Sequence, residues 1–74
     1  MADHQITAEV SGSVWKILVA EGDSVELDDE IMILECMKME IPVFATAAGV
    51  VKTIAVAEAD NVLEEQVLAI VQID

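Results

Sequence analysis

The sequence is poor in aromatic residues, basic residues and cysteine, and each shortage is informative. Aromatic residues make up 3% of the 74 residues, so the apolar 55% consists mainly of small or branched side chains that suit a thin two-layer core. Three lysines against fifteen acidic residues give a formal net charge of −12. This charge repels phosphate backbones and anionic membrane surfaces, which excludes nucleic-acid binding and favours a soluble monomer. No apolar run approaches the length of a membrane span.

A single cysteine, Cys36, excludes a disulfide framework. Together with a polar start that lacks a signal peptide, it predicts a reducing, cytoplasmic environment. No histidine or cation stands beside Cys36 in the sequence, so we expect a small buried hydrophobe rather than a reactive thiol. His4 has no partner motif, and we expect it to be solvated. The length predicts one domain over residues 1–74, near the lower limit for folding on a core alone.

The two halves of the chain repeat each other at an offset of 37 residues, without a gap. Ten of the thirty aligned pairs are identical. Two copies are too few for a solenoid, so we expect a closed pseudo-twofold domain in which each half supplies one layer. Lys38 would then lie opposite the chain terminus. The identical pairs are Ala8/Ala45, Gly12/Gly49, Val14/Val51, Ile17/Ile54, Val19/Val56, Ala20/Ala57, Glu21/Glu58, Asp23/Asp60, Val25/Val62 and Ile33/Ile70.

Short stretches rich in valine and isoleucine predict an all-β fold. Small and polar residues separate them, as is typical of tight turns. A helix through Val43–Val56 would have to cross the branched residues that follow Gly49, which disfavours it. The predicted strands are Val14–Val19, Ile31–Met37, Met39–Phe44, Val50–Val56 and Val67–Ile73.

The central strand pair has one register that separates apolar from polar side chains. A two-residue loop at Met37 and Lys38 places only apolar residues on one face, whereas a three-residue loop centred on Lys38 mixes both faces. It also places Glu35 opposite Glu40, two like charges that need access to water. The predicted partners are Cys36 with Met39, Glu35 with Glu40, Leu34 with Ile41, Ile33 with Pro42, and Met32 with Val43.

The segment Glu35-Cys-Met-Lys-Met-Glu40 resembles the attachment motif of biotinyl domains, written (Ala/Ser/Cys)-Met-Lys-Met. Val19-Ala-Glu-Gly-Asp-Ser-Val25 resembles their preceding Glu-Gly-Asp-x-Val turn, and Ala48-Gly-Val-Val51 resembles the Gly-x-Val opening of their second half. The similarity runs from about Ala8 to Ile73. The motif stands at the centre of the twofold repeat, which makes it far more specific than Met-Lys-Met alone.

The resemblance implies a barrel-sandwich hybrid, a small flattened barrel whose exposed hairpin presents Lys38. A biotin protein ligase would join biotin to the Lys38 amine, and the biotin would carry a carboxyl group from a biotin carboxylase to a carboxyltransferase. Met37 and Met39 would make adaptable contacts with partners, and Glu35 and Glu40 would help partner recognition. The chain would itself be a carrier and not an enzyme. A start at Met1 slightly favours a free-standing carrier over a fragment of a larger subunit.

The chain departs from the family pattern in its turns. Asp28 and Glu65 stand where glycine is common, and Ala59 stands where the first half has Gly22. Glu and Ala adopt left-handed geometry less easily than Asp, so the second-half turn is expected to differ in shape or to carry strain.

Several alternatives remain open. A lipoyl carrier would use the same lysine, but lipoyl domains usually show Asp-Lys-Ala at the tip. An unmodified β-rich adaptor module would share the fold alone. Lys38 could also simply pair with Glu35 or Glu40, and Met37 and Met39 could be ordinary core residues. An enzyme is the weakest reading, because metal-ligand spacing, a nucleophile with a nearby base, and a phosphate-binding glycine loop are all missing.

Overall fold

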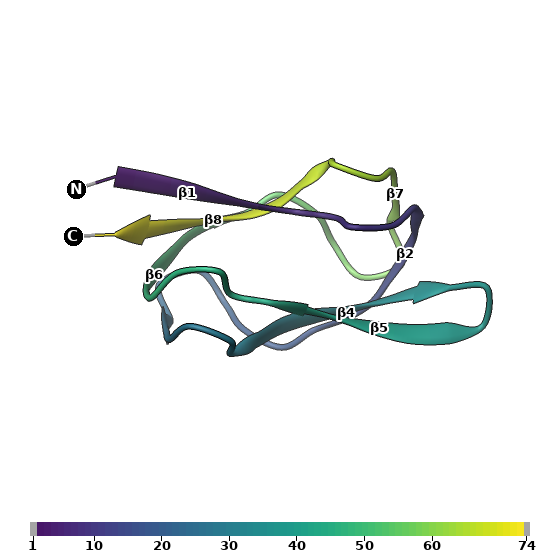
Figure 1. Ribbon diagram of the computed structural model, residues 1–74, viewed down its shortest axis with the longest axis horizontal. Helices are drawn as coiled ribbons and strands as arrows, with labels where there is room; N and C mark the ends of the chain where they lie inside the picture. The colour runs from purple at the N-terminus through teal and green to yellow at the C-terminus, as the bar shows by residue number, and fades with distance from the viewer. Residues whose placement is uncertain (1, 74) are drawn as a thin grey trace.

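The computed structural model describes residues 2–73, and all of their regular structure is β-strand (Figure 1). The all-β prediction is confirmed, and the five predicted strands are present with their ends shifted by at most two residues. Residues 2–73 contain no helix that is long and apolar enough to cross a membrane. The strands are β1 (Ala2–Thr7), β2 (Gly12–Ile17), β3 (Ser24–Val25), β4 (Glu30–Cys36), β5 (Met39–Phe44), β6 (Gly49–Ile54), β7 (Asn61–Val62) and β8 (Val67–Ile73).

Three strands were not predicted. In β1, Ile6 is the one buried residue, so its sequence carries little hydrophobic alternation. Strands β3 and β7 have two residues each, which is too short for any periodic signal. His4 lies in β1, is partly exposed, and its Nε2 hydrogen-bonds the Thr46 hydroxyl, so the expectation of a solvated residue without a partner was only partly correct. These three strands form because they pair with strands that are distant in the sequence: β1 with β8, β3 with β6 and β7 with β2.

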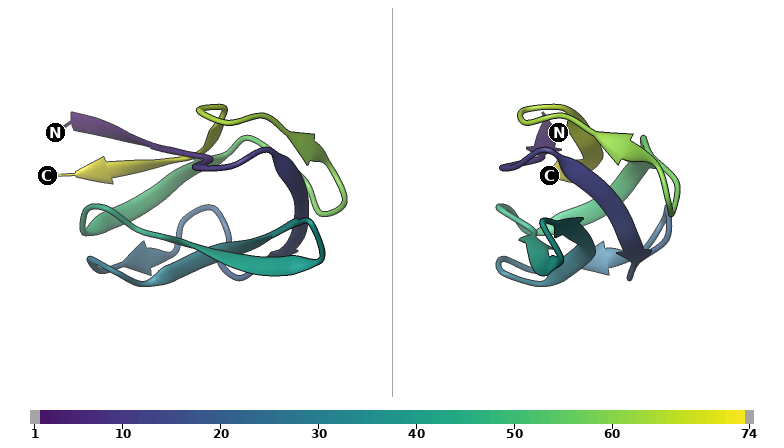
Figure 2. Two further views of the ribbon diagram at one scale, coloured as in Figure 1. Left: turned by 45° about the vertical axis from the view of Figure 1, so that its right-hand side comes forward. Right: turned by 90° about the vertical axis from the view of Figure 1, so that its right-hand side faces the viewer.

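The strands form two antiparallel sheets of order β1-β8-β6-β3 and β5-β4-β2-β7 (Figures 1 and 2). Each sheet takes two strands from each sequence half, so the expectation that each half supplies one layer was wrong. The halves interlock because β3 pairs with β6 and β7 pairs with β2. The pairing of β1 with β8 is the pseudo-twofold counterpart of the hairpin formed by β4 and β5.

The same main-chain hydrogen bonds occur in both halves and run between them. The Gly22 amide donates to the Val51 carbonyl at 2.8 Å, and the equivalent Ala59 amide donates to Val14 at 2.7 Å. Two glutamates make equivalent contacts between the halves. The Glu21 carboxylate accepts a hydrogen bond from the Ile54 amide, and the Glu58 carboxylate accepts one from the Ile17 amide. The two carboxylate contacts account for the identity of Glu21 and Glu58 in the repeat.

The repeated glycines allow close approach of neighbouring strands. A Cβ added at Gly12 would lie 2.3 Å from the Glu35 carbonyl oxygen, and one at Gly49 would lie 2.2 Å from that of Gln72. Real Cβ atoms do not come so close to a backbone oxygen. Only glycine therefore fits at these two positions without displacing the neighbouring strand.

The turn shapes are kept despite the substitutions away from glycine. Ala59 and Glu65 have φ of 76° and 72°, and their first-half counterparts Gly22 and Asp28 have 95° and 71°. The expected change of shape does not occur. Of the two expected outcomes, the structure supports backbone strain in the second half. A residue other than glycine with left-handed backbone angles destabilises the folded state by roughly 1–2 kcal/mol.

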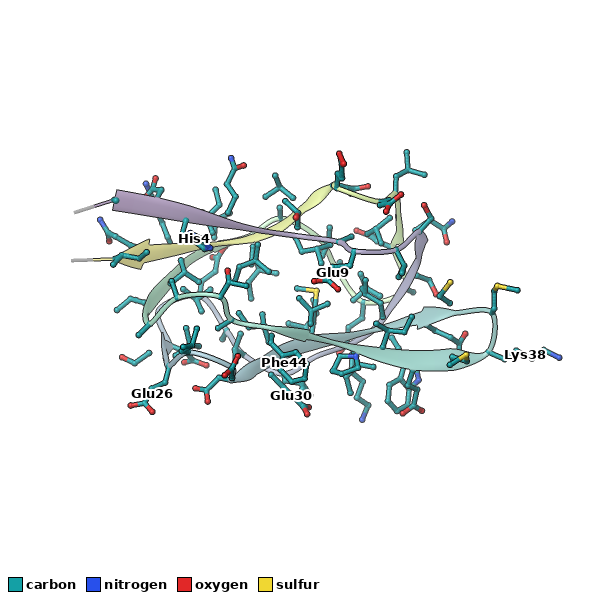
Figure 3. All side chains as sticks on the ribbon, in the orientation of Figure 1. His4, Glu9, Glu26, Glu30, Lys38 and Phe44 are labelled. Atoms are coloured by element: carbon teal, nitrogen blue, oxygen red, sulfur yellow. The ribbon has the colours of Figure 1, made fainter. Side chains whose placement is uncertain are left out.

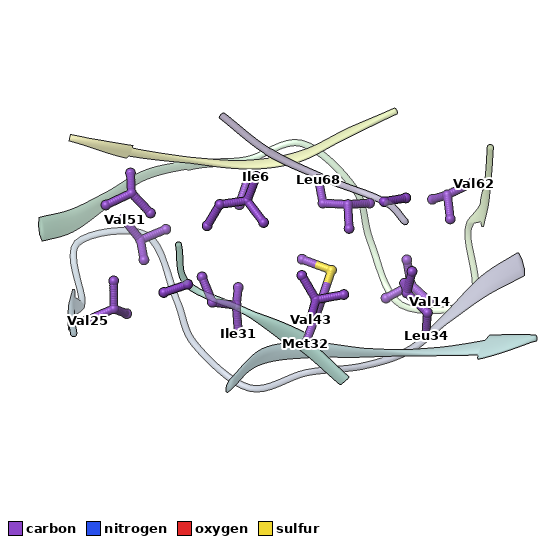
Figure 4. Close-up of a cluster of buried hydrophobic side chains, with 14 residues drawn as sticks. Ile6, Val14, Val25, Ile31, Met32, Leu34, Val43, Val51, Val62 and Leu68 are labelled. Carbon is purple, nitrogen blue, oxygen red and sulfur yellow. The ribbon is translucent and has the colours of Figure 1, made fainter. Parts of the chain in front are cut away.

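The core is a thin apolar layer between the sheets (Figure 4). Every buried residue in the described range is hydrophobic, and no buried side-chain polar atom there lacks a hydrogen-bond partner. Most core residues are small or branched, as the composition predicts. The largest fully buried side chains are Ile31, Met32, Leu34, Leu68, Val14, Val51 and Val71.

Candidate functional site

The candidate site is the hairpin of β4 and β5, whose observed register is the predicted one. All five predicted partner pairs, from Cys36/Met39 to Met32/Val43, face each other in the structure. Met32 and Leu34 are fully buried, so this face of the hairpin anchors it to the core. The hairpin therefore extends from a packed base to a free tip.

The tip is a two-residue turn at Met37 and Lys38. Their φ values are 52° and 65°, and a type I′ turn requires positive φ at both central residues. Neither residue is one of the asparagine or glycine types that favour this geometry. The lysine is thus held in a conformation that is unfavourable for it, which is a common property of functional positions.

Lys38 is exposed and extends away from the body of the domain (Figure 3). It lies at the opposite end of the molecule from the outer ends of β1 and β8, as the pseudo-twofold repeat predicts (Figures 1 and 3). The expected alternative, an ion pair with Glu35 or Glu40, is not formed. Among residues 2–73 the ion pair present is that of Lys52 with Asp3, at 2.9 Å. The Lys38 amine is therefore available for chemistry.

The two methionines beside the lysine are also exposed. Met37 is 90% exposed and Met39 is 65% exposed, although Met39 lies on the apolar face of the hairpin. Neither is a core residue, which excludes that alternative. Two unbranched, polarizable side chains in water beside a free amine form a surface that can adapt to a partner.

Glu35 and Glu40 face each other in the second residue pair from the turn, behind Cys36 and Met39, and both are exposed as the register requires. Like charges in directly opposed positions destabilise a sheet slightly, so the pair has a small cost in the isolated domain. Cys36 is a free cysteine and is half-buried, so the expectation of a buried side chain was only partly correct.

Sequence reasoning did not single out Trp15 and Lys16, which lie on the outward face of the same sheet. A register shift in β2 between Val14 and Lys16 leaves both side chains exposed, with Trp15 at 44%. The Lys16 Nζ lies 5.6 Å from the centre of the Trp15 ring. The signal available in the sequence was that the single tryptophan is followed directly by one of the three lysines.

Comparisons with known proteins agree with this geometry. A family model described as "Biotin-requiring enzyme" matches residues 2–74. The biotin/lipoyl attachment protein of Bacillus subtilis is 43% identical over 63 residues, which cover 85% of this chain and 86% of that protein. The homologue of biotinylated protein TB7.3 in Mycobacterium leprae is 38% identical over 66 residues, covering 89% of this chain and 93% of that protein.

A solved structure shows the same fold. The urea carboxylase of Kluyveromyces lactis superposes with a TM-score of 0.91 and 33% sequence identity. The match covers 97% of this chain and 6% of the carboxylase. The fold of this chain is therefore similar to that of one small part of the larger carboxylase.

Proposed function

The chain belongs to the biotin/lipoyl family of biotin-requiring enzymes, and we propose that it is a biotin carboxyl carrier modified at Lys38. A biotin protein ligase forms an amide bond between the carboxyl group of biotin and the Nζ of Lys38. When attached, biotin carries a carboxyl group between a biotin carboxylase and a carboxyltransferase. The chain itself supplies the attachment point and the scaffold, without catalysis.

The observation that carries this proposal is the free amine of Lys38 on an exposed two-residue turn. A primary amine on a four-carbon stem becomes, after amidation, a longer arm that reaches two separate active sites. Tethering keeps the effective concentration of the attached group high at both sites. The core-anchored base of the hairpin limits the motion to the arm.

The neighbours of Lys38 serve recognition in this proposal. Met37 and Met39 fit apolar partner pockets of different shapes, because their side chains are flexible and polarizable. Glu35 and Glu40 attract a basic partner surface to the tip by electrostatic steering. We also propose a single monomeric domain over residues 1–74 and a cytoplasmic location, which the size, the charge and the single cysteine favour.

The proposal is tested by modification in vitro. Incubation with biotin, ATP and a biotin protein ligase is expected to add one biotin per chain, seen as one increment in intact mass. Lys38→Arg removes the acceptor amine and abolishes the increment, whereas the control Lys52→Arg leaves it unchanged. An unmodified wild-type chain that is folded would refute the assignment. A mass increment on incubation with a lipoyl ligase instead would identify a lipoyl carrier, and none with either would leave an adaptor module.

Substitution of Met37 and Met39 distinguishes biotinylation of the chain from carboxyl transfer by the biotinylated chain. Met37→Leu and Met39→Leu are expected to reduce carboxyl transfer from the biotinylated chain more than they reduce biotinylation. Two active sites must accept the modified tip in turn, so loss of adaptability affects transfer more strongly. Equal losses in the two assays would contradict this division of roles.

A further inference from the structure

The outward face of the sheet β5-β4-β2-β7 carries two cross-strand rows behind the tip. The first row contains the acidic pair Glu40 and Glu35 and continues to Ser13. The second row contains Pro42, Ile33 and Lys16. Trp15 lies between these rows in β2 and is 44% exposed. We name the apolar part of this surface, consisting of Trp15, Ile33 and Pro42, the hairpin-side patch.

The pseudo-twofold symmetry provides an internal reference for this surface at the other end of the domain. The counterpart of Glu40 is Asp3, and the counterpart of Trp15 is Lys52. Asp3 and Lys52 form an ion pair at 2.9 Å, so this carboxylate at the far end has a cationic partner. At the hairpin end a tryptophan replaces that lysine, and no ion pair to Glu35 or Glu40 occurs within residues 2–73. Within the described residues, Glu35 and Glu40 at the hairpin end are therefore left without an ion-pair partner, beside an exposed ring.

These features match a partner surface that carries arginine side chains. A guanidinium group pairs with carboxylates and also stacks on an indole ring, so one kind of group satisfies both parts of the surface. The ring already lies near a cation, since the Lys16 Nζ is 5.6 Å from its centre. Tryptophan is also among the residues that most often contribute strongly to binding at protein interfaces.

The geometry points to the hairpin-side patch, together with the adjoining pair Glu35 and Glu40, as the docking surface for the basic face of the biotin protein ligase, an inference that rests on the proposed function. The enzyme that acylates Lys38 must bring its active site to an amine on a four-carbon stem. Its surface therefore meets the rows immediately behind the tip. The carboxylase and carboxyltransferase are reached by the longer biotinylated arm and have no such need to approach this face.

The test compares Trp15→Lys with the matched control Val50→Lys. Val50 is 41% exposed on the other sheet, so both changes place a lysine at a similarly exposed strand position. Trp15→Lys is expected to raise the KM of the ligase for the carrier at least about tenfold with kcat unchanged, because docking is lost and Lys38 is intact. Val50→Lys is expected to change neither constant. Circular dichroism of both variants verifies that they fold.

The outcomes separate this inference from the proposed function. Wild-type chain that accepts biotin while Trp15→Lys has an unaltered KM would refute the docking surface alone. An equal rise in KM for Val50→Lys would also refute it, because a general charge effect would then suffice. Wild-type chain that accepts no biotin would refute both.

A second measurement does not depend on a variant that folds. Trp15 is the single tryptophan, so 5-fluorotryptophan labelling gives one ¹⁹F signal. Addition of unlabelled ligase is expected to shift or broaden this signal, and a signal that stays unchanged at saturating ligase would overturn the inference.

Discussion

The exchange of glycine and alanine between two equivalent turns tests whether left-handed backbone geometry limits the stability of this domain. Gly22 and Ala59 occupy the third position of four-residue turns that have the same hydrogen bonds. In the first turn the Asp23 amide donates to the Ala20 carbonyl at 3.1 Å, and in the second turn the equivalent bond from Asp60 is also 3.1 Å. A type II turn requires positive φ at this position, which favours glycine.

The magnitude follows from the backbone alone. Ala59 at φ 76° loses roughly 1–2 kcal/mol relative to glycine in the folded state. Glycine loses about 0.5–1 kcal/mol more conformational entropy on folding, which offsets part of this gain. Ala59→Gly is therefore expected to increase the free energy of unfolding by about 0.5–1 kcal/mol. For a domain of this size that raises Tm by about 2–8 °C.

Gly22→Ala is the reciprocal change and is expected to lower the free energy of unfolding by about 1 kcal/mol. No heavy atom lies within 4 Å of a Cβ added at Gly22, so a clash does not contribute. The double variant Gly22→Ala/Ala59→Gly is expected to return close to the wild-type value.

Urea unfolding followed by circular dichroism measures these differences, with thermal unfolding as a second determination. The m-value should stay constant, because the turns do not change the surface exposed on unfolding. A loss of stability in Ala59→Gly, or no change in Gly22→Ala, would refute the argument that φ at this position decides the difference.

Three further predictions concern the contacts between strands. Gly12→Ala should lower the free energy of unfolding by about 1–3 kcal/mol, since its Cβ would meet the Glu35 carbonyl oxygen at 2.3 Å; an unchanged urea midpoint would contradict this. Glu58→Ala removes the carboxylate that accepts from the Ile17 amide at 3.1 Å and should cost about 0.5–1.5 kcal/mol, measured in the same way; no loss would show that water replaces it fully. Lys52→Ala breaks an exposed ion pair and should cost at most about 1 kcal/mol, a difference that should vanish in 1 M salt; a larger or salt-insensitive loss would indicate a packing role.

The hairpin could be derived from the sequence because its information is local. Side chains alternate between the two faces of a strand, so one register alone places Met32, Leu34 and Val43 on the same face. The loop length and the exposed position of Lys38 follow from that register. The all-β fold and the longer strands follow from another local signal, the short stretches rich in valine and isoleucine that turn residues separate.

The interlocking of the two halves could not be derived in this way. Strands β3 and β7 are too short to have a pattern of their own, and they are fixed by hydrogen bonds to β6 and β2 of the opposite half. The positive φ of Ala59 and Glu65 has the same origin, since the amides of both residues donate to carbonyls of the first half. Alanine and glutamate disfavour positive φ, and the tertiary hydrogen bonds outweigh this backbone preference.

The sequence by itself determined the repeat, the β-class, the hairpin register and the lysine at its tip. Aligning the two halves reveals the repeat, strand-forming residues indicate the β-class, and short-range alternation fixes the register and the position of the lysine. Only the tertiary structure decided which strands share a sheet and which charges are neutralised. Lys52 pairs with Asp3, whereas Glu35 and Glu40 face each other beside Trp15. These differences between the two ends depend on contacts between residues of different strands. A local sequence pattern therefore cannot predict them.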